Sequence, residues 1–344
     1  MRSHSGGLFV LALLLAAGAL WLGAGDAFVF DSQAAIPKNP LLRSVNGEFD
    51  SLRAAALSSD SGSLRRPVAM LSFALNALGS GVDRAGPYRL TNILIHVCNG
   101  LLVFLLAGRL LRASPVLNVS AESARWIAAL AAGLWVLQPL SVTTVLYVVQ
   151  SMAQLSTLFV IAGLTTYVCY RERWIDRQPR IGEVLAGVVW VLLFTVLAVY
   201  SKENGLLLLW AVPVLELCFF AGYLGGERRT WLATLAGVAC LLPLLLGLAL
   251  FLSSPGLVLD AYEARSYGLV ERLQTQGRVL WHYVGWSLFP WGPGAGLHHD
   301  DIAVSTGWLH PVTTLTSALA WLAALAAALL GRSRWPLFSF AVLF

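Results

Sequence analysis

Charged side chains are scarce in this chain. Asp, Glu, Lys and Arg make up only 12% of the 344 residues, roughly half the share that is usual in soluble domains. Apolar residues make up 58%, and several uninterrupted apolar runs reach the ~20 residues that a helix needs to cross a bilayer. This composition argues against an ordinary soluble domain and predicts an all-α polytopic membrane protein.

Other common signatures are also missing. We find no internal repeat and no low-complexity tract, and the four cysteines lie within apolar segments without a CxxC pair. That pattern indicates buried thiols rather than a disulfide framework or a cysteine metal site. The net charge of +5 comes mostly from arginines between the apolar runs, so it reports topology rather than nucleic-acid binding.

The apolar runs predict eight membrane-spanning helices and the start of a ninth at Trp335. By the positive-inside rule, the arginine-rich loops and the N-terminus face the cytoplasm. The loops 26–89, 201–204 and 253–310 then lie outside. The predicted spans are 8–25, 90–111, 126–146, 152–170, 184–200, 205–223, 230–252 and 311–330.

Three segments need a separate interpretation. The apolar stretch 278–291, RVLWHYVGWSLFPW, is too short to span, so we expect a re-entrant or interfacial helix with its tryptophans at headgroup depth. Residues 41–58 show helical spacing of apolar residues among charged ones, which predicts an amphipathic helix on the membrane surface. The first apolar run has a basic start and a small-residue end, so a cleavable signal peptide is an alternative to a first span.

Ionisable and amide side chains gather at the predicted outer ends of the helices, where such residues are costly and often functional. Asn92 and His96, for example, are four residues apart and so share one face of a helix. The candidate catalytic residue is Asp31. The candidate substrate-binding residues are Arg66, Asn92, His96, Gln150, Lys202, Glu203, His299 and Asp300.

A carboxylate near cations and amides suits a substrate that carries a phosphate. Arg66 and Lys202 would hold the phosphate or diphosphate, and Asp31 would take a proton from an acceptor hydroxyl. Less specific interpretations stay open: Lys202 and Glu203 as a surface ion pair at a capped turn, and His96 as a packed histidine. The run HHDD, 298–301, could bind a divalent metal, although adjacent residues rarely all point at one ion. No other cofactor is predicted.

Several quoted segments also resemble a known family. They are FVFDSQAAIPKNP (28–40), RRPVAMLSFALNAL (65–78), YRLTNILIHVCNGLLVFLL (88–106), 138–168, YSKENGLLLLWAVPVLEL (200–217) and 297–315. In this order they resemble the polytopic GT-C glycosyltransferases, and most closely the membrane domain of the transmembrane and tetratricopeptide-repeat O-mannosyltransferases and their bacterial relatives. The resemblance covers nearly the whole chain.

The resemblance implies a GT-C-type helical bundle, over 1–344, with a long first outer loop that bears amphipathic helices. It implies transfer of a sugar from a polyprenyl-phosphate carrier to a secreted protein or envelope glycan, with inversion and with Asp31 as the general base. The expected location is the bacterial inner membrane, with the site facing the periplasm. Because the chain ends within the apolar run FSFAVLF, we expect further helices, and a repeat domain, to follow.

The sequence departs from the family at three positions. Ser32 stands where the family has a second acidic residue, Gln138 where it has histidine, and Ser151 where it has arginine. These departures keep open a non-catalytic assembly or binding protein that retains the fold. A transporter or flippase of lipid-linked sugars is a further alternative, for which paired interrupted helices or internal symmetry would be expected; the sequence indicates neither.

Overall fold

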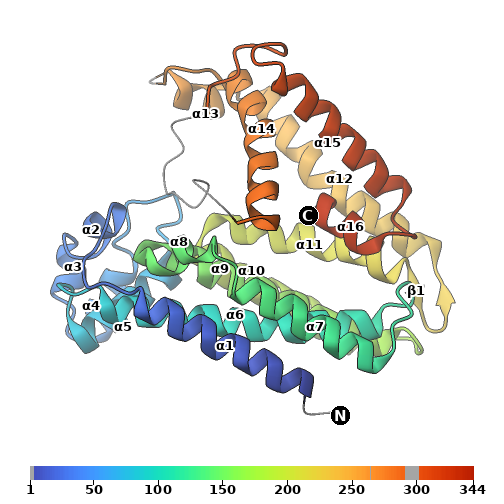
Figure 1. Ribbon diagram of the computed structural model, residues 1–344, viewed down its shortest axis with the longest axis horizontal. Helices are drawn as coiled ribbons and strands as arrows, with labels where there is room; N and C mark the ends of the chain where they lie inside the picture. The colour runs from blue at the N-terminus through green and yellow to red at the C-terminus, as the bar shows by residue number, and fades with distance from the viewer. Residues whose placement is uncertain (1–3, 264, 291–301) are drawn as a thin grey trace. The chain divides into compact units, whose positions relative to one another are not determined.

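The structure, a computed structural model, describes residues 4–263, 265–290 and 302–344, and its regular secondary structure is almost entirely helical (Figure 1). Seven of the described helices are long and apolar enough to cross a membrane. This confirms the all-α, polytopic character predicted from composition, since helices satisfy their backbone hydrogen bonds internally, as an apolar solvent requires. The described strands, β1 (Tyr223–Leu224) and β2 (Glu227–Arg228), form one small sheet.

The chain divides into two compact units. The first comprises residues up to 212 together with 224–227, and the second comprises 213–223 and 228–344. The first contains α1 (His4–Leu22), α2 (Asp31–Ala35), α3 (Pro40–Arg43), α4 (Phe49–Ala56), α5 (Pro67–Ser80), α6 (Gly86–Ala113), α7 (Ala121–Val136), α8 (Ser141–Leu146), η1 (Val148–Gln150), α9 (Ser151–Trp174), α10 (Ile181–Ser201), η2 (Glu203–Leu206) and most of α11 (Leu207–Leu215). The second contains the π-helical turn η3 (Glu216–Phe220), α12 (Thr230–Ser253), α13 (Gly256–Leu259), η4 (Asp260–Tyr262), α14 (Leu269–Leu288), α15 (Thr313–Leu330) and α16 (Pro336–Leu343).

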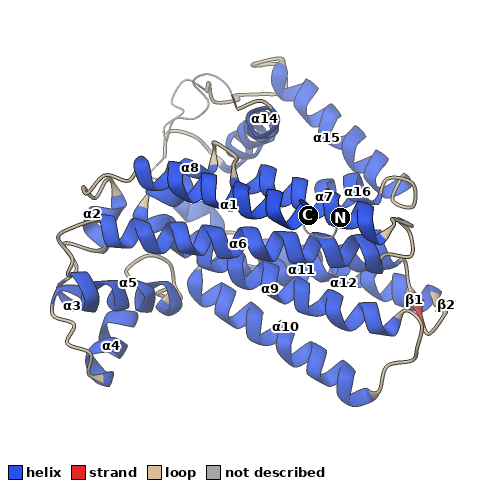
Figure 2. Ribbon diagram, turned by 60° about the horizontal axis from the view of Figure 1, so that its bottom comes forward, coloured by secondary structure: helices blue, strands red, loops and turns tan. Residues whose placement is uncertain are grey.

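Small residues allow the long helices of the first unit to pack closely. A Cβ on Gly100 of α6 would overlap the side chain of Val136 on α7, and one on Gly133 of α7 would lie 3.5 Å from Ala12 of α1. In lipid, helices associate through such close packing rather than through the hydrophobic effect. Figure 2 shows α6, α9 and α10 running alongside one another in the same unit.

The long loop after α1 folds into a helical cap, which we define as α2 to α5. Its core includes Ile36, Leu42 and Phe73, which pack with Val148 of η1 and Met152 of α9. The helix predicted over 41–58 is two shorter ones, α3 and α4, separated by a turn in which Gly47 has φ 85°. The cap therefore packs on the end of the bundle where α6 and α9 begin.

The helix predicted over 126–146 is interrupted, which corrects the sequence interpretation. α7 ends at Val136 and α8 begins at Ser141, because Pro139 lacks an N–H and disfavours a helical conformation at the residue before it. The 16 residues of α7 extend about 24 Å, less than the ~30 Å apolar core of a bilayer. Two helices, α7 and α8, therefore take the place of the single helix predicted over 126–146.

In the second unit, the helix predicted at 278–291 begins earlier, at Leu269, as part of α14. α14 is not among the seven helices long and apolar enough to span. It packs on α15 through Trp281 and Trp321, whose ring centroids are 4.5 Å apart, and the Trp321 indole donates to the carbonyl of Gly277 at 2.9 Å. That this segment stays on one side of the bilayer remains a prediction.

The close contact of α6 with α7 can be tested at Gly100. We expect Gly100→Ala to destabilise the protein by about 1–3 kcal/mol, because the added methyl group overpacks the contact with Val136. Gly18→Ala is the matched control, since a Cβ there meets nothing within 4 Å, and it should be neutral or slightly stabilising. Thermal unfolding of the purified chain in detergent measures both. Equal melting temperatures for the two variants would contradict the packing described above.

Candidate functional site

A stripe of buried polar side chains runs along α6. Arg89, Asn92, His96 and Asn99 are spaced three, four and three residues apart, so they share one helix face. All four are at most 6% exposed. Because buried polar groups require partners, the stripe predicts a polar surface opposite α6, and the interrupted segment from α7 to α9 provides it.

Arg89 donates hydrogen bonds to three backbone carbonyls. Its Nε donates to the carbonyl of Leu146 at 2.9 Å, and its two terminal nitrogens donate to the carbonyls of Gly25 and Ala27. One guanidinium group thus joins the segment after α1 to the end of α8. The adjacent Asp26 carboxylate accepts from the Gly86 N–H at 2.9 Å and from Arg84, and the bond from Arg84 lowers the pKa of Asp26.

Asn92 and His96, both predicted to bind substrate, lie within this polar contact. The Asn92 amide donates to the carbonyl of Val145 at 3.0 Å, and the His96 Nε2 lies 3.0 Å from the carbonyl of Val136, the last residue of α7. The His96 ring stacks on Trp135 with centroids 5.0 Å apart. In this structure the two side chains therefore stabilise the chain around the interruption.

Asp31 is the first residue of α2, with its side chain exposed. Its backbone N–H donates to the Tyr147 hydroxyl at 3.1 Å, and the hydroxyl of buried Ser32 accepts from the Val149 N–H at 3.2 Å. These bonds fix α2 against η1 and leave the Asp31 carboxylate in the open. Burial raises the pKa of Tyr147, so this hydroxyl keeps its proton and can donate it to a carboxylate or ligand.

Arg66 and Glu203 form a two-pronged ion pair across 137 residues of sequence. The Arg66 Nε lies 3.1 Å from both carboxylate oxygens, and a terminal nitrogen lies 2.9 Å from Oε2. Arg65 and Arg66 both adopt left-handed backbone, with φ 56° and 46°, a conformation that costs about 1–2 kcal/mol per residue. Gly62 lies so close that a Cβ there would overlap Glu203. The turn at Arg65 and Arg66, with its left-handed backbone, therefore positions the Arg66 side chain against the Glu203 carboxylate.

Lys202 lies beside this ion pair, between α10 and η2. Burial lowers its pKa, the Arg66 charge lowers it further, and Glu203 opposes both. Its ammonium makes no hydrogen bond or ion pair with any residue that the structure describes. The neighbouring carboxylate is already engaged by Arg66, so the cluster has a half-buried cation without a dedicated partner.

The segment from Tyr147 to Met152 connects these features. Asp31 bonds Tyr147 at one end, and Arg66 contacts the Met152 sulfur at 3.5 Å at the other. Four residues of 3₁₀ and α-helix lie between the two ends, which are roughly 10 Å apart along the helix axis. Gln150 lies between them, half-buried in η1.

His299 and Asp300 lie outside the described residues, as does the whole HHDD run. Among the residues that are described, no three His, Cys, Asp or Glu side chains come together as a metal site would require. The structure thus brings Asp31, Gln150, Arg66, Lys202 and Glu203 to one end of the bundle.

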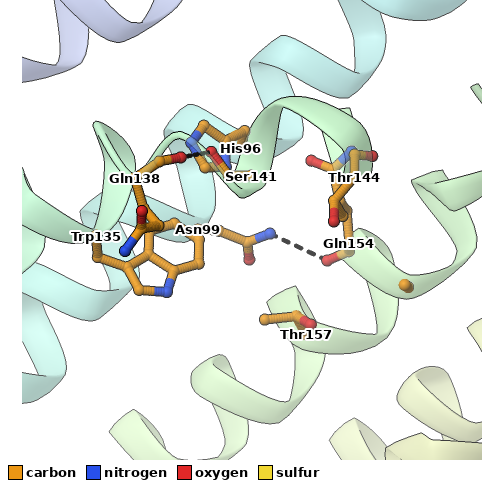
Figure 3. Close-up of a pocket in the computed structure, with 9 residues that line it drawn as sticks. His96, Asn99, Trp135, Gln138, Ser141, Thr144, Gln154 and Thr157 are labelled. Carbon is orange, nitrogen blue, oxygen red and sulfur yellow. Dashed lines mark hydrogen bonds between the residues drawn. The ribbon is translucent and has the colours of Figure 1, made fainter. Parts of the chain in front are cut away.

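A cavity of about 160 Å³ lies in the first unit, where α6 faces α7, α8 and α9 (Figure 3). The Asn99 amide nitrogen donates to the carbonyl of Gln154 at 3.1 Å, and the Gln154 amide nitrogen to the carbonyl of Thr144 at 3.1 Å. Their amide oxygens are buried and find no partner among the described groups. The residues around the cavity are His96, Asn99, Trp135, Gln138, Ser141, Thr144, Ala153, Gln154 and Thr157.

Sequence reasoning did not single out Arg89 or Asn99 as important. The available signal was the spacing of four polar residues on one face of an apolar helix, of which only Asn92 and His96 were considered. Comparison of the chain with family models, with curated proteins and with solved structures gave no match in any of the three.

The charge balance of the Lys202 cluster can be tested by a double-mutant cycle. We expect Glu203→Gln to destabilise the protein by about 1–3 kcal/mol, because Arg66 and Lys202 then face each other without an anion. Adding Lys202→Met should recover part of that loss, since one of the two cations is removed. Thermal unfolding at low salt provides the measurement.

The matched control is Glu172→Gln, which breaks the ion pair with Arg109. Glu172 and Glu203 side chains are equally exposed, at 37%, but among the described residues Glu172 forms an ion pair with Arg109 alone. An isolated pair of this kind contributes about 1 kcal/mol or less. The same loss for Glu203→Gln with and without Lys202→Met would show that Lys202 is not coupled to the pair.

Proposed function

We propose that the chain is a membrane glycosyltransferase of GT-C type that moves a sugar from a polyprenyl-phosphate carrier to a hydroxyl acceptor outside the membrane. The observation that carries this proposal is the placement of an exposed carboxylate, Asp31, at one end of the short segment 147–152 and of Arg66, with the half-buried cation Lys202 beside it, at the other. A base and an anion-binding group at one end of an apolar bundle suit a lipid-linked phosphate substrate.

The reaction assigns one role to each group. The acceptor oxygen forms a bond to the anomeric carbon and gives its proton to the Asp31 carboxylate. The bond between that carbon and the phosphate oxygen breaks, and the phosphate leaves with the electron pair. Lys202 and Arg66 would stabilise its charge. Attack from the face opposite the phosphate inverts the anomeric configuration, which requires the base and the phosphate-binding groups to lie on opposite sides of the sugar.

Two of the departures from the family have a local explanation. Ser32 is fully buried and bonds the Val149 N–H, so an exposed second acid would not fit its position. Ser151 is 1% exposed, which leaves little room for an arginine, while Arg66 reaches the next residue, Met152. Arg66 thus supplies a cation near the place where the family has one.

A flippase of lipid-linked sugars is the second candidate, favoured by the interruption between α7 and α8. Discontinuous helices beside a polar cavity are typical of transporter binding sites. This alternative gives no role to the Asp31 carboxylate, so the test of Asp31 separates the two candidates.

We expect Asp31→Asn to lower sugar transfer by about 10²–10⁴-fold, since the amide cannot accept the acceptor's proton. The backbone bond to Tyr147 is unaffected, so the fold should persist. Asp60→Asn is the matched control, an exposed aspartate in the same cap loop. Mass spectrometry of envelope proteins and glycans from cells that carry each variant measures the transfer. Unchanged glycosylation in Asp31→Asn, with both proteins well expressed, would exclude Asp31 as the base.

Lys202→Ala should weaken binding of free polyprenyl phosphate about 10-fold or more, the effect of losing one charge-assisted hydrogen bond. Lys38→Ala, which removes an exposed lysine in the cap, should not change the affinity. Equilibrium binding to the purified chain in detergent distinguishes the two. Equal affinities for all three proteins would assign the phosphate to another part of the chain.

A further inference from the structure

Arginines gather at one end of the first unit. The segments 109–125 and 171–183 contain seven arginines, no lysine and four carboxylates. They comprise the end of α6, the start of α7, the end of α9 and the start of α10, with the loops between them. These helix ends lie together, because Arg109 of α6 bonds Glu172 of α9 at 3.0 Å, while α6 packs on α7 and α9 on α10 (Figure 2). We call the two segments the arginine end.

The arginine end is remote from the candidate site. α10 connects the two, since Arg180 precedes its first residue and Lys202 follows its last. The 21 residues of α10 extend about 32 Å. The phosphate of a carrier bound at Lys202 therefore cannot contact the arginine end, and a ligand of these arginines is a different molecule.

The carboxylates at the arginine end do not balance its cations. The ion pairs here are Arg109 with Glu172 and Arg177 with Glu183. Arg112, Arg125 and Arg173 form no ion pair with any residue that the structure describes, and neither do the exposed carboxylates of Glu122 and Asp176. The positive-inside rule accounts for the presence of arginines at this end, but three of their charges have no anion from the described part of the chain.

An exposed apolar face of α6 leads to one of these arginines. Arg112 lies seven residues after Leu105, so the two side chains share a helix face, and both are exposed. The same face continues through two further exposed leucines, Leu101 and Leu94. A cation at the end of a lipid-facing apolar stripe suits a molecule in which alkyl chains are joined to an anionic headgroup.

We propose that the arginine end binds anionic phospholipids, with the headgroup phosphate at Arg112, Arg125 and Arg173 and an acyl chain along the exposed leucines of α6. A guanidinium group can bind a phosphate through two parallel hydrogen bonds. Trp126, exposed beside Arg125, is of the residue type that is enriched at headgroup depth. A zwitterionic headgroup carries its own cation and should bind more weakly. This inference does not depend on sugar transfer.

The test is binding of phosphatidylglycerol and of phosphatidylcholine with the same acyl chains to the purified full-length chain in detergent, measured by native mass spectrometry. We expect a preference for phosphatidylglycerol. The double variant Arg112→Gln/Arg173→Gln should bind this lipid about 20-fold more weakly, because each cation near an anionic headgroup contributes about fivefold. Arg112→Lys/Arg173→Lys keeps both charges and should keep most of the preference. The matched control is Lys38→Gln/Arg53→Gln, which removes two exposed cations from the cap and should change nothing.

Three results would overturn the inference. The first is equal affinity of the wild type for the two lipids, or the same loss in the control as in Arg112→Gln/Arg173→Gln. The second is binding of glycerol 3-phosphate as tight as that of phosphatidylglycerol, since the apolar face would then contribute nothing. The third is weaker binding of polyprenyl phosphate in Arg112→Gln/Arg173→Gln but not in Lys202→Ala, which would assign these arginines to the carrier.

Discussion

The interruption between α7 and α8 imposes the constraint on which the first unit depends. A helix that stops within apolar surroundings leaves carbonyl groups without partners, and each such group is costly where water is absent. α6 supplies the donors, because the guanidinium, amide and imidazole groups of Arg89, Asn92 and His96 reach the carbonyls of Leu146, Val145 and Val136. One face of one helix therefore makes the break possible.

The position of the candidate site follows from those bonds. Because Arg89 and Asn92 hold the end of α8, Tyr147 and η1 lie in a fixed place, and α2 is bonded to them through Asp31 and Ser32. Arg89 also binds the carbonyls of Gly25 and Ala27, where the chain leaves α1. The same buried arginine therefore binds the backbone that precedes Asp31 and the carbonyl of Leu146, next to the Tyr147 that bonds the Asp31 N–H.

Composition and apolar periodicity predicted the helical membrane architecture and most of the long helices, because burial in lipid leaves a strong signal in sequence. The interruption at Pro139 was missed because the residues on both sides stay apolar. The ion pair of Arg66 with Glu203 was not predictable, since its partners are 137 residues apart and only the fold of the cap brings them together. Asn92 and His96 were recognised as unusual, but their partners are backbone atoms, which a sequence does not distinguish.

Lys202 shows how the cluster relates stability to ligand binding. Its pKa is lowered by burial and by Arg66, so the charged ammonium is less stable in the folded chain than in the unfolded one. Between the lowered pKa and the ordinary value near 10.5, the unfolded state binds more protons, and stability rises with pH; below that window the full cost of the buried charge persists. An anion bound beside Lys202 would raise the pKa again and remove that cost. A half-buried cation whose charge Glu203 stabilises only in part is suited to the phosphate binding proposed above.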